Sequence, residues 1–112
     1  HTYLDNLQKE DLVRILIEPK NSIIKQYQTS FKLDGIKLTF TDEAIDAIAQ
    51  QSYEQNTGAR GLRSIVENLM LGISYDIPSI PDVTEVIIDK DNVINKTTPR
   101  IIRDAKYISA NS

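Results

Sequence analysis

The residues whose types and spacing most clearly suggest a chemical function lie in the segment Thr57-Gly58-Ala59-Arg60-Gly61-Leu62-Arg63. Its glycines allow another part of the chain to approach closely, and the apolar periodicity that follows predicts that a helix begins here. Arg60 would then lie in the first turn, where unsatisfied N–H groups and the positive end of the helix dipole attract anions. A guanidinium adds a planar fork of hydrogen-bond donors. The segment therefore predicts contact with a phosphate or a similar anion.

The rest of a nucleotide site is absent from the sequence, because no GxxxxGK[ST] loop occurs in the 112 residues. If Arg60 contacts a nucleotide, the other parts of the site must lie on another polypeptide segment. On spacing alone, a simpler interpretation stays open, in which Arg60 is a solvated residue at a helix start. Arg63 has Glu67 four positions later, which predicts an intrahelical ion pair of about 0.3–0.5 kcal/mol. Arg60 has no such partner and is the freer cation.

Other polar residues complete no recognisable catalytic arrangement. Glu18 and Asp76 have no neighbouring histidine or nucleophile, so we expect capping or interface roles for them. No serine has a G-x-S-x-G setting, and the one histidine is the first residue. Tyr27, Tyr53 and Tyr75 are candidates for a recognition surface, but tyrosines at the edge of a core are the commoner case. Hydrolase chemistry by this chain alone is therefore not expected.

The composition describes an ordinary globular domain and excludes several functions. The chain is 40% hydrophobic and 26% charged, and its net charge of −3 disfavours general nucleic-acid binding. The absence of cysteine excludes disulfides and thiolate metal sites, and a reducing compartment fits. No apolar run approaches the roughly 18 residues of a membrane span. At this length we expect one domain with a continuous core.

Apolar spacing predicts four helices, and the first two lie in the N-terminal third. Residues 9–17 form a short helix, and a second starts near Pro19, whose missing N–H suits a first turn. The third is capped by Thr41 and continues to about Tyr53. The fourth begins near Gly58, is the longest and most apolar, and ends before Pro78.

Alternating apolar residues predict the strands. Residues 36–40 and 84–88 alternate in this way and are expected to pair, and residues 100–102 are expected to form a third, edge strand. Between them, Asp89-Lys90-Asp91-Asn92 is interpreted as a turn, and Val93-Ile94 as the beginning of a brief helical or irregular piece. The predicted fold class is α+β, with about four helices packed on a small two- to three-stranded sheet.

Four segments taken together resemble the C-terminal small AAA+ domain of the ClpX family of ATP-dependent protein unfoldases. They are residues 12–21 (LVRILIEPKN), 25–28 (KQYQ), 57–67 (TGARGLRSIVE) and 75–79 (YDIPS). The resemblance spans about residues 4–95 in the same order and with similar spacing. The first two segments favour ClpX over its relative HslU, which remains the closest rival within the AAA+ proteins.

The resemblance implies roles for particular residues. Arg60 would be the sensor-2 arginine, which faces a nucleotide held mainly by a preceding large AAA+ domain of the same subunit. Leu7 falls near the hinge between the two domains, where it either contacts the base side of the nucleotide or packs. Tyr75 and Asp76 become candidates for the hinge or for contacts between subunits. The fragment alone, without the Walker motifs, is not expected to hydrolyse ATP.

The same resemblance implies a domain plan, cofactors and partners. Residues 1–8 would end a hinge from a missing large domain, residues 9–103 would be the small domain, and residues 104–112 would be a flexible tail. The whole protein would use ATP or ADP with Mg²⁺, and zinc only in a missing N-terminal domain. Its partners would be the neighbouring subunits of a homohexameric ring, a ClpP-type peptidase and protein substrates, with no nucleic acid and no membrane. The expected location is the bacterial cytoplasm, with an organelle matrix as the alternative.

Two functions of other classes remain open. In the first, the chain is a nucleotide-independent scaffold whose apolar helix faces and Tyr75 bind another protein, and Arg60 is incidental. In the second, Arg60, Arg63, Arg100 and Arg103 form a local nucleic-acid patch despite the acidic total.

Overall fold

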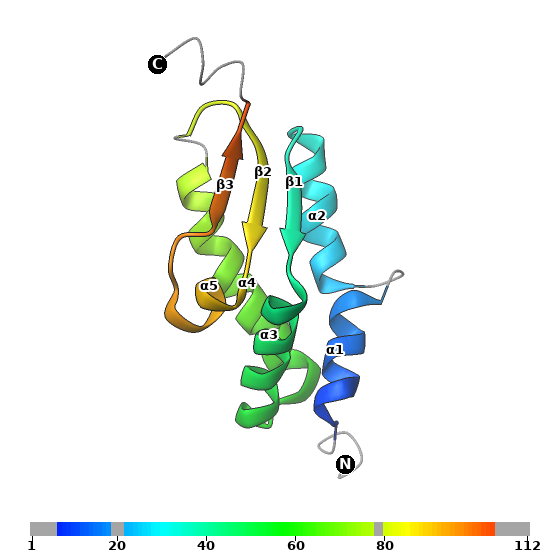
Figure 1. Cartoon of the computed structure of the whole chain (residues 1–112). Helices are drawn as coiled ribbons and strands as arrows, with labels where there is room; N and C mark the ends of the chain where they lie inside the picture. Colours follow the sequence, from blue (N-terminus) through cyan, green and yellow to red (C-terminus); the bar gives the residue numbers. More distant parts are fainter. Residues whose placement is uncertain (1–6, 19–21, 78–79, 105–112) are drawn as a thin grey trace.

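The computed structural model of the chain describes residues 7–18, 22–77 and 80–104. Within these ranges the chain forms five helices and three strands (Figure 1). In order they are α1 (Lys9–Ile17), α2 (Ile23–Leu33), β1 (Lys37–Phe40), α3 (Asp42–Gln55), α4 (Gly58–Asp76), β2 (Val83–Ile88), α5 (Lys90–Asn95) and β3 (Arg100–Arg103). The prediction of an α+β fold is confirmed, with one helix more than expected.

The three strands form one mixed sheet in the order β1-β2-β3. The pairing of β1 with β2 is parallel and sets Lys37 opposite Glu85 and Phe40 opposite Ile88. Because parallel neighbours need a crossover, the chain passes through α3 and α4 between them. β3 returns antiparallel to β2 as an edge strand, and an irregularity between Val83 and Glu85 shifts its register. The predicted pairing and the predicted edge strand are both confirmed.

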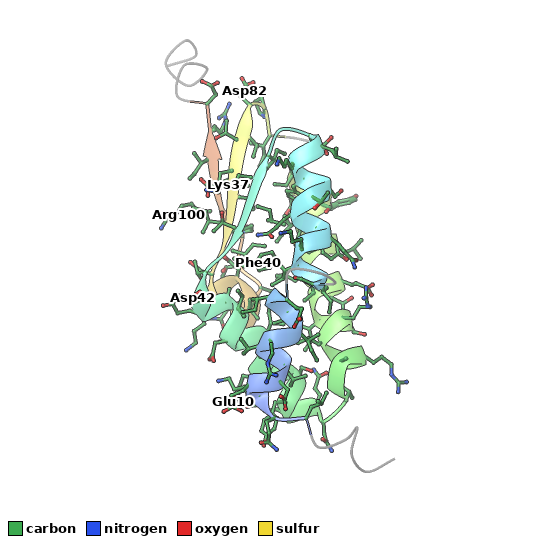
Figure 2. The ribbon with its side chains drawn as sticks, turned by 90° about the vertical axis from the view of Figure 1, so that its right-hand side faces the viewer. Glu10, Lys37, Phe40, Asp42, Asp82 and Arg100 are labelled. Atoms are coloured by element: carbon green, nitrogen blue, oxygen red, sulfur yellow. The ribbon has the colours of Figure 1, made fainter. Side chains whose placement is uncertain are left out.

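α2 and α4 cover one face of the sheet, whereas α1, α3 and α5 lie beyond the end of the strands. In Figure 1 the strands lie in front of α4 with α2 beside β1, and the turned view of Figure 2 shows α2 and α4 together on one side of the sheet. The side chains alternate accordingly: Leu38, Phe40, Val86 and Ile88 are buried. On the other face, Thr39 donates a hydrogen bond from Oγ1 to Oε2 of Glu85 at 2.8 Å.

α3 lies between α1, α4 and α5, and it combines small and large apolar side chains. Ala44, Ala47 and Ala49 are buried and let neighbouring helices approach closely, while Ile48 is fully buried between them. Thr41 caps its start by accepting a hydrogen bond from the N–H of Ala44 at 3.1 Å, as predicted. α3 thereby connects α1, α4 and α5 into one core.

α4 contributes a long apolar face to this core. Its inward face consists of Leu62, Val66, Met70 and Ile73, all buried and spaced at helical intervals. α4 begins beside α3, and its later part runs behind the sheet in Figure 1. The prediction of one long apolar helix that begins near Gly58 is confirmed, and so is its end before Pro78.

The start of α2 differs from the prediction. Pro19 lies outside the described residues, and the described helix begins only at Ile23, after the extended residue Ser22. Ser22 is buried, donates a hydrogen bond to the carbonyl of Leu16 and accepts one from the N–H of Lys25 at 3.1 Å. Its hydroxyl therefore joins the end of α1 to the start of α2 and sets where the second helix begins.

The turn predicted at residues 89–92 is wrong, because the segment is the start of α5. Asp89 is the N-cap and accepts hydrogen bonds from the N–H groups of Asp91 and Asn92, at 3.1 and 3.4 Å. Asn92 returns a bond by accepting from the N–H of Asp89 at 2.7 Å. This reciprocal capping box stabilises a helical first turn in place of a free turn.

Most of the predicted terminal segments lie outside the described residues. This applies to residues 1–6 of the expected hinge and to residues 105–112 of the expected tail.

Candidate functional site

The turn between α3 and α4 has a tightly defined backbone. Asn56 ends α3 in the left-handed conformation, with φ 56° and ψ 39°, and its N–H bonds to the carbonyls of Ser52 and Tyr53, both at 3.1 Å. Gly58 has a φ of 63°, where a residue with a Cβ is strained. An asparagine and a glycine are the residue types that adopt these conformations at the least cost, so the sequence encodes this sharp turn locally.

A buried hydroxyl connects the two helices on either side of this turn. Ser52 is fully buried in the last turns of α3, and its Oγ donates to the carbonyl of Gly58 at 3.1 Å. Because Gly58 is the first residue of α4, this bond fixes the place where α4 leaves α3.

Gly61 makes a second close contact at the same point. It is buried, and a methyl group added at its Cα would lie 2.8 Å from Cβ of Thr57 and closer still to Oγ1 of Thr57. Thr57 stands at the N-cap of α4, yet its side chain makes no capping hydrogen bond. The Thr57 side chain lies instead against the bare Cα of Gly61. The glycine is therefore required for close approach, as the sequence predicted, although a side chain and not another backbone occupies the space.

Arg60 lies between Gly58 and Gly61 in the first turn of α4. The residue is exposed, and among the described residues it has neither a hydrogen bond nor an ion pair. Its neighbour Arg63 is exposed too, but the predicted ion pair between Arg63 and Glu67 is absent. Long exposed side chains gain little from such a pair and lose rotamer freedom, which explains why the spacing alone overestimated it. The site thus consists of an unpaired arginine side chain on a turn whose backbone is tightly defined.

The electrostatic influence of Arg63 and Glu67 falls on Tyr27 of α2. Burial raises the pKa of the Tyr27 hydroxyl above its ordinary value, the Glu67 carboxylate raises this pKa further, and the Arg63 guanidinium opposes both. Tyr27 is half-buried and packs against the core, which confirms the structural role expected for it. Arg63 and Glu67 therefore lie close enough to Tyr27 to influence its charge state.

Leu7, expected near the hinge, precedes α1 and is half-buried against the core. Of its two possible roles, packing is visible in the structure.

Tyr75 and Asp76 lie at the other end of α4, away from Arg60. Tyr75 is 87% exposed, so the interpretation of this tyrosine as a core-edge residue is wrong. Leu71, one turn earlier on the same side of the helix, is 73% exposed, and the sequence analysis did not single it out. We call Leu71 and Tyr75 together the outer patch of α4. Asp76 is exposed and is the last residue of the helix.

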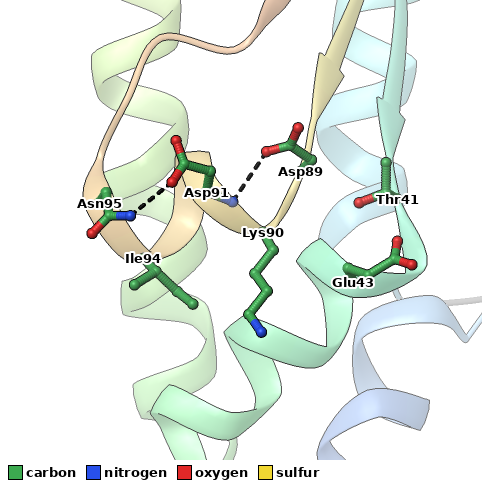
Figure 3. Close-up of a pocket in the computed structure, with 7 residues that line it drawn as sticks. All are labelled: Thr41, Glu43, Asp89, Lys90, Asp91, Ile94 and Asn95. Atoms are coloured by element: carbon green, nitrogen blue, oxygen red, sulfur yellow. Dashed lines mark hydrogen bonds between the residues drawn. The ribbon is translucent and has the colours of Figure 1, made fainter.

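A surface hollow lies at the opposite end of α3 from Arg60. Figure 3 shows it where β1 and β2 end, with Thr41 and Glu43 on one side and α5 on the other. Its carboxylates are largely occupied: Asp89 caps α5, and Asp91 accepts from Asn95 and Thr97, both at 2.7 Å. Because a 14-residue helix is about 21 Å long, this hollow is not part of the Arg60 site.

The arginines proposed as a nucleic-acid patch are dispersed. Arg60 and Arg63 lie at the start of α4, at the lower end of Figure 1, whereas Arg100 and Arg103 lie on β3 in the upper half. Nε of Arg103 donates to the carbonyl of Pro81 at 2.9 Å. A single continuous basic surface is therefore not formed by these four residues.

The residues that the structure describes contain no group of three or more histidine, cysteine or acidic residues placed to hold a metal ion. None of their helices combines the length and the apolar character that crossing a membrane requires.

Comparison with known proteins gives one family match. Residues 7–75 match the model of the C-terminal, D2-small domain of ClpB protein. This range includes α1 to α3, the turn with Gly58 and nearly all of α4, so it covers the whole Arg60 site.

Three similar proteins carry the same name. The chain is 45% identical over 109 residues to the ATP-dependent Clp protease ATP-binding subunit ClpX of Borrelia duttonii and to that of Borrelia recurrentis. It is 58% identical over 99 residues to the subunit of the same name from Treponema denticola. These matches cover 97%, 97% and 88% of this chain. The chain spans about a quarter of the length of these curated relatives, at 25%, 25% and 24%.

Proposed function

The chain belongs to the family of C-terminal D2-small domains, as a small AAA+ domain of the ClpX type, and from this premise we propose that it is the lid of an ATP-driven protein unfoldase. In this role it contacts the nucleotide held by a large AAA+ domain, moves about a hinge and packs in a ring. The observation that carries the proposal is Arg60, an exposed cation without a partner among the described residues, on a helix start of fixed geometry.

The chemistry of Arg60 fits the terminal phosphates of ATP. A guanidinium hydrogen bond to a charged group contributes about 1.5–3 kcal/mol, and it is lost when the phosphate leaves. Because this contribution differs between the ATP, ADP and empty states, it biases the orientation of the domain according to the nucleotide. The Mg²⁺ that accompanies ATP would be held by the large domain. Any zinc would belong to an N-terminal domain.

The continuous core makes the domain suited to rigid-body motion. Ser22 joins α1 to α2, Ser52 joins α3 to α4, and the sheet includes strands from both sides of α4. A domain connected in this way transmits a rotation at the hinge without deforming internally. We place Leu7 at the hinge side, where its packing against the core would link the preceding segment to α1.

The outer patch of α4 supports the proposed contact between subunits. Leu71 and Tyr75 are large apolar side chains on one side of the helix, and burial of such surface favours association. We propose that they, with Asp76, contact the neighbouring subunit of a hexameric ring in the cytoplasm. The ring would unfold protein substrates and deliver them to a ClpP-type peptidase. A nucleotide-independent scaffold would use the same patch, so Arg60 distinguishes the two functions.

The test is Arg60→Ala in the full-length protein. Removing the charged hydrogen bond should weaken ATP binding about ten- to a hundredfold and slow substrate unfolding. Thermal unfolding should stay close to the parent, because the residue is exposed. Arg63→Ala is the matched control, three residues later on the same helix, and should bind ATP as the parent does. Equal ATP binding and unfolding rates in Arg60→Ala and parent would refute the nucleotide role and favour the scaffold.

A further inference from the structure

We infer that the contact between Thr57 and Gly61 is a positioning device that sets the orientation of Arg60 towards the nucleotide. This inference rests on the proposed function of Arg60. It adds the residues that hold the arginine in place and assigns Thr57 a role other than helix capping. Both residues flank the arginine, one on each side along the chain.

The backbone that carries Arg60 is held in a defined conformation. The backbone before Arg60 is fixed by the left-handed Asn56, by the positive φ of Gly58 and by the buried hydrogen bond from Ser52. Helical bonding fixes the backbone after it. The side chain of Arg60 itself makes no hydrogen bond or ion pair with described residues, so its direction depends on the backbone from which it projects.

A threonine at an N-cap normally accepts a hydrogen bond from an N–H of the first turn. Thr57 does not, because its backbone, with φ −111° and ψ 2°, is not extended as a capping residue requires. Its side chain lies against Gly61 instead. Thr57 therefore occupies a capping position without capping, and its side chain contacts the glycine that follows Arg60.

Gly61 and Gly72 lie on the same helix in different surroundings. A methyl group added at Gly72 would meet no atom within 4 Å, whereas one added at Gly61 would collide with Thr57. Adding this methyl group would force Thr57 outwards and rotate the first helical turn of α4, from which Arg60 projects. A displacement of this kind misaligns a directional hydrogen bond even when the fold persists.

The test uses the full-length protein and compares Gly61→Ala with Gly72→Ala. Gly61→Ala should raise the KM for ATP about three- to tenfold, which corresponds to partial loss of a charged hydrogen bond. Gly72→Ala should leave KM at the parental value. Parental KM for Gly61→Ala would overturn the inference.

A double-mutant cycle separates positioning from general damage to the structure. In an Arg60→Ala background, Gly61→Ala should raise KM no further, because the arginine through which it acts is gone. An equal increase in both backgrounds would overturn the inference and assign Gly61 a purely structural role. If Arg60→Ala alone leaves KM unchanged, the proposed function fails and the inference fails with it. If Arg60→Ala raises KM and Gly61→Ala does not, the inference fails and the proposed function stands.

A second pair of variants covers the case in which Gly61→Ala does not fold. Thr57→Gly removes the side chain from an exposed position, so folding is preserved, but it releases Arg60 from its support. Thr57→Gly should raise the KM for ATP when Arg60 is present and should have no effect on it in the Arg60→Ala background. Thr57→Ser keeps both atoms that lie against Gly61 and should retain the parental KM. Parental KM for Thr57→Gly would overturn the inference.

Discussion

The two glycines of α4 allow a sharp prediction about stability, since the same substitution should have opposite effects at the two sites. Replacing glycine by alanine in a helix stabilises it by about 0.8–1.0 kcal/mol, because the unfolded chain loses conformational freedom. At Gly72 nothing opposes this gain, as an added methyl group meets no atom within 4 Å. Gly72→Ala should therefore be stabilising.

At Gly61 the same gain is opposed by a collision. The added methyl group would lie 2.8 Å from Cβ of Thr57, which is backbone-proximal and cannot rotate away. Overpacking of this kind costs about 1–3 kcal/mol, so Gly61→Ala should be destabilised by up to about 2 kcal/mol. The two variants should therefore differ by about 1–3 kcal/mol. For 112 residues the unfolding entropy is about 0.2 kcal/mol/K, and this difference corresponds to about 4–13 °C in Tm.

Thermal unfolding followed by circular dichroism measures this difference, and urea titration gives the free energy directly. A third variant identifies the cause. In a Thr57→Gly background the colliding atoms are absent, and the remaining neighbour, Oε1 of Gln55, would lie at an ordinary 3.6 Å. Gly61→Ala should then become stabilising, as at Gly72. A Gly61→Ala variant as stable as Gly72→Ala in the parental background would refute the reasoning.

Three further predictions concern the core, the turn and the effect of pH. Leu62→Ala should lower the free energy of unfolding by about 3 kcal/mol in urea titration, because Leu62 is fully buried where α4 begins. Asn56→Gly should retain or raise Tm. Asn56→Ala should lower the free energy of unfolding by about 1 kcal/mol, and with it Tm, because the φ of Asn56 is 56°. Hydrogen bonds from Asn95 and Thr97 lower the pKa of the Asp91 carboxyl, so its contribution to stability is present above its ordinary pKa and is lost as pH falls through the lowered one. The Tm difference between parent and Asp91→Ala, measured across pH, should therefore shrink below about pH 4, and a constant difference would contradict this.

The helices were predictable because their signals are local and redundant. Thr41 is followed by two acidic residues and an apolar stripe, and Asn56 and Gly58 are residues that tolerate a positive φ. The start of α5 was missed because Asp89 and Asn92 are common in turns as well. Only their reciprocal hydrogen bonds, visible in three dimensions, distinguish a capping box from a free turn.

The sequence places Arg60 at a helix start, where spacing alone leaves a solvated residue as an open interpretation, and the family resemblance adds the expectation of a nucleotide role. The contacts around Arg60 were not predictable. The contact of Thr57 with Gly61 depends on a turn geometry that spacing does not specify, and threonine at an N-cap suggests capping first. The exposure of Tyr75 was missed for a similar reason. Its position relative to the core depends on how α4 is rotated against its neighbours.

The parallel pairing of β1 with β2 has a consequence for the order of folding. The bond between Thr39 and Glu85 joins residues 46 positions apart, and closing so large a loop costs entropy before any strand contact compensates for it. Packing α3 against α4 shortens the effective loop, so the two helices should form the folding nucleus and the sheet should close late. Substitutions in the buried face of α4 should therefore slow folding, whereas those in β3 should mainly accelerate unfolding. The turn that carries Arg60 joins these two helices, so the candidate site would be among the first parts of the domain to acquire its native geometry.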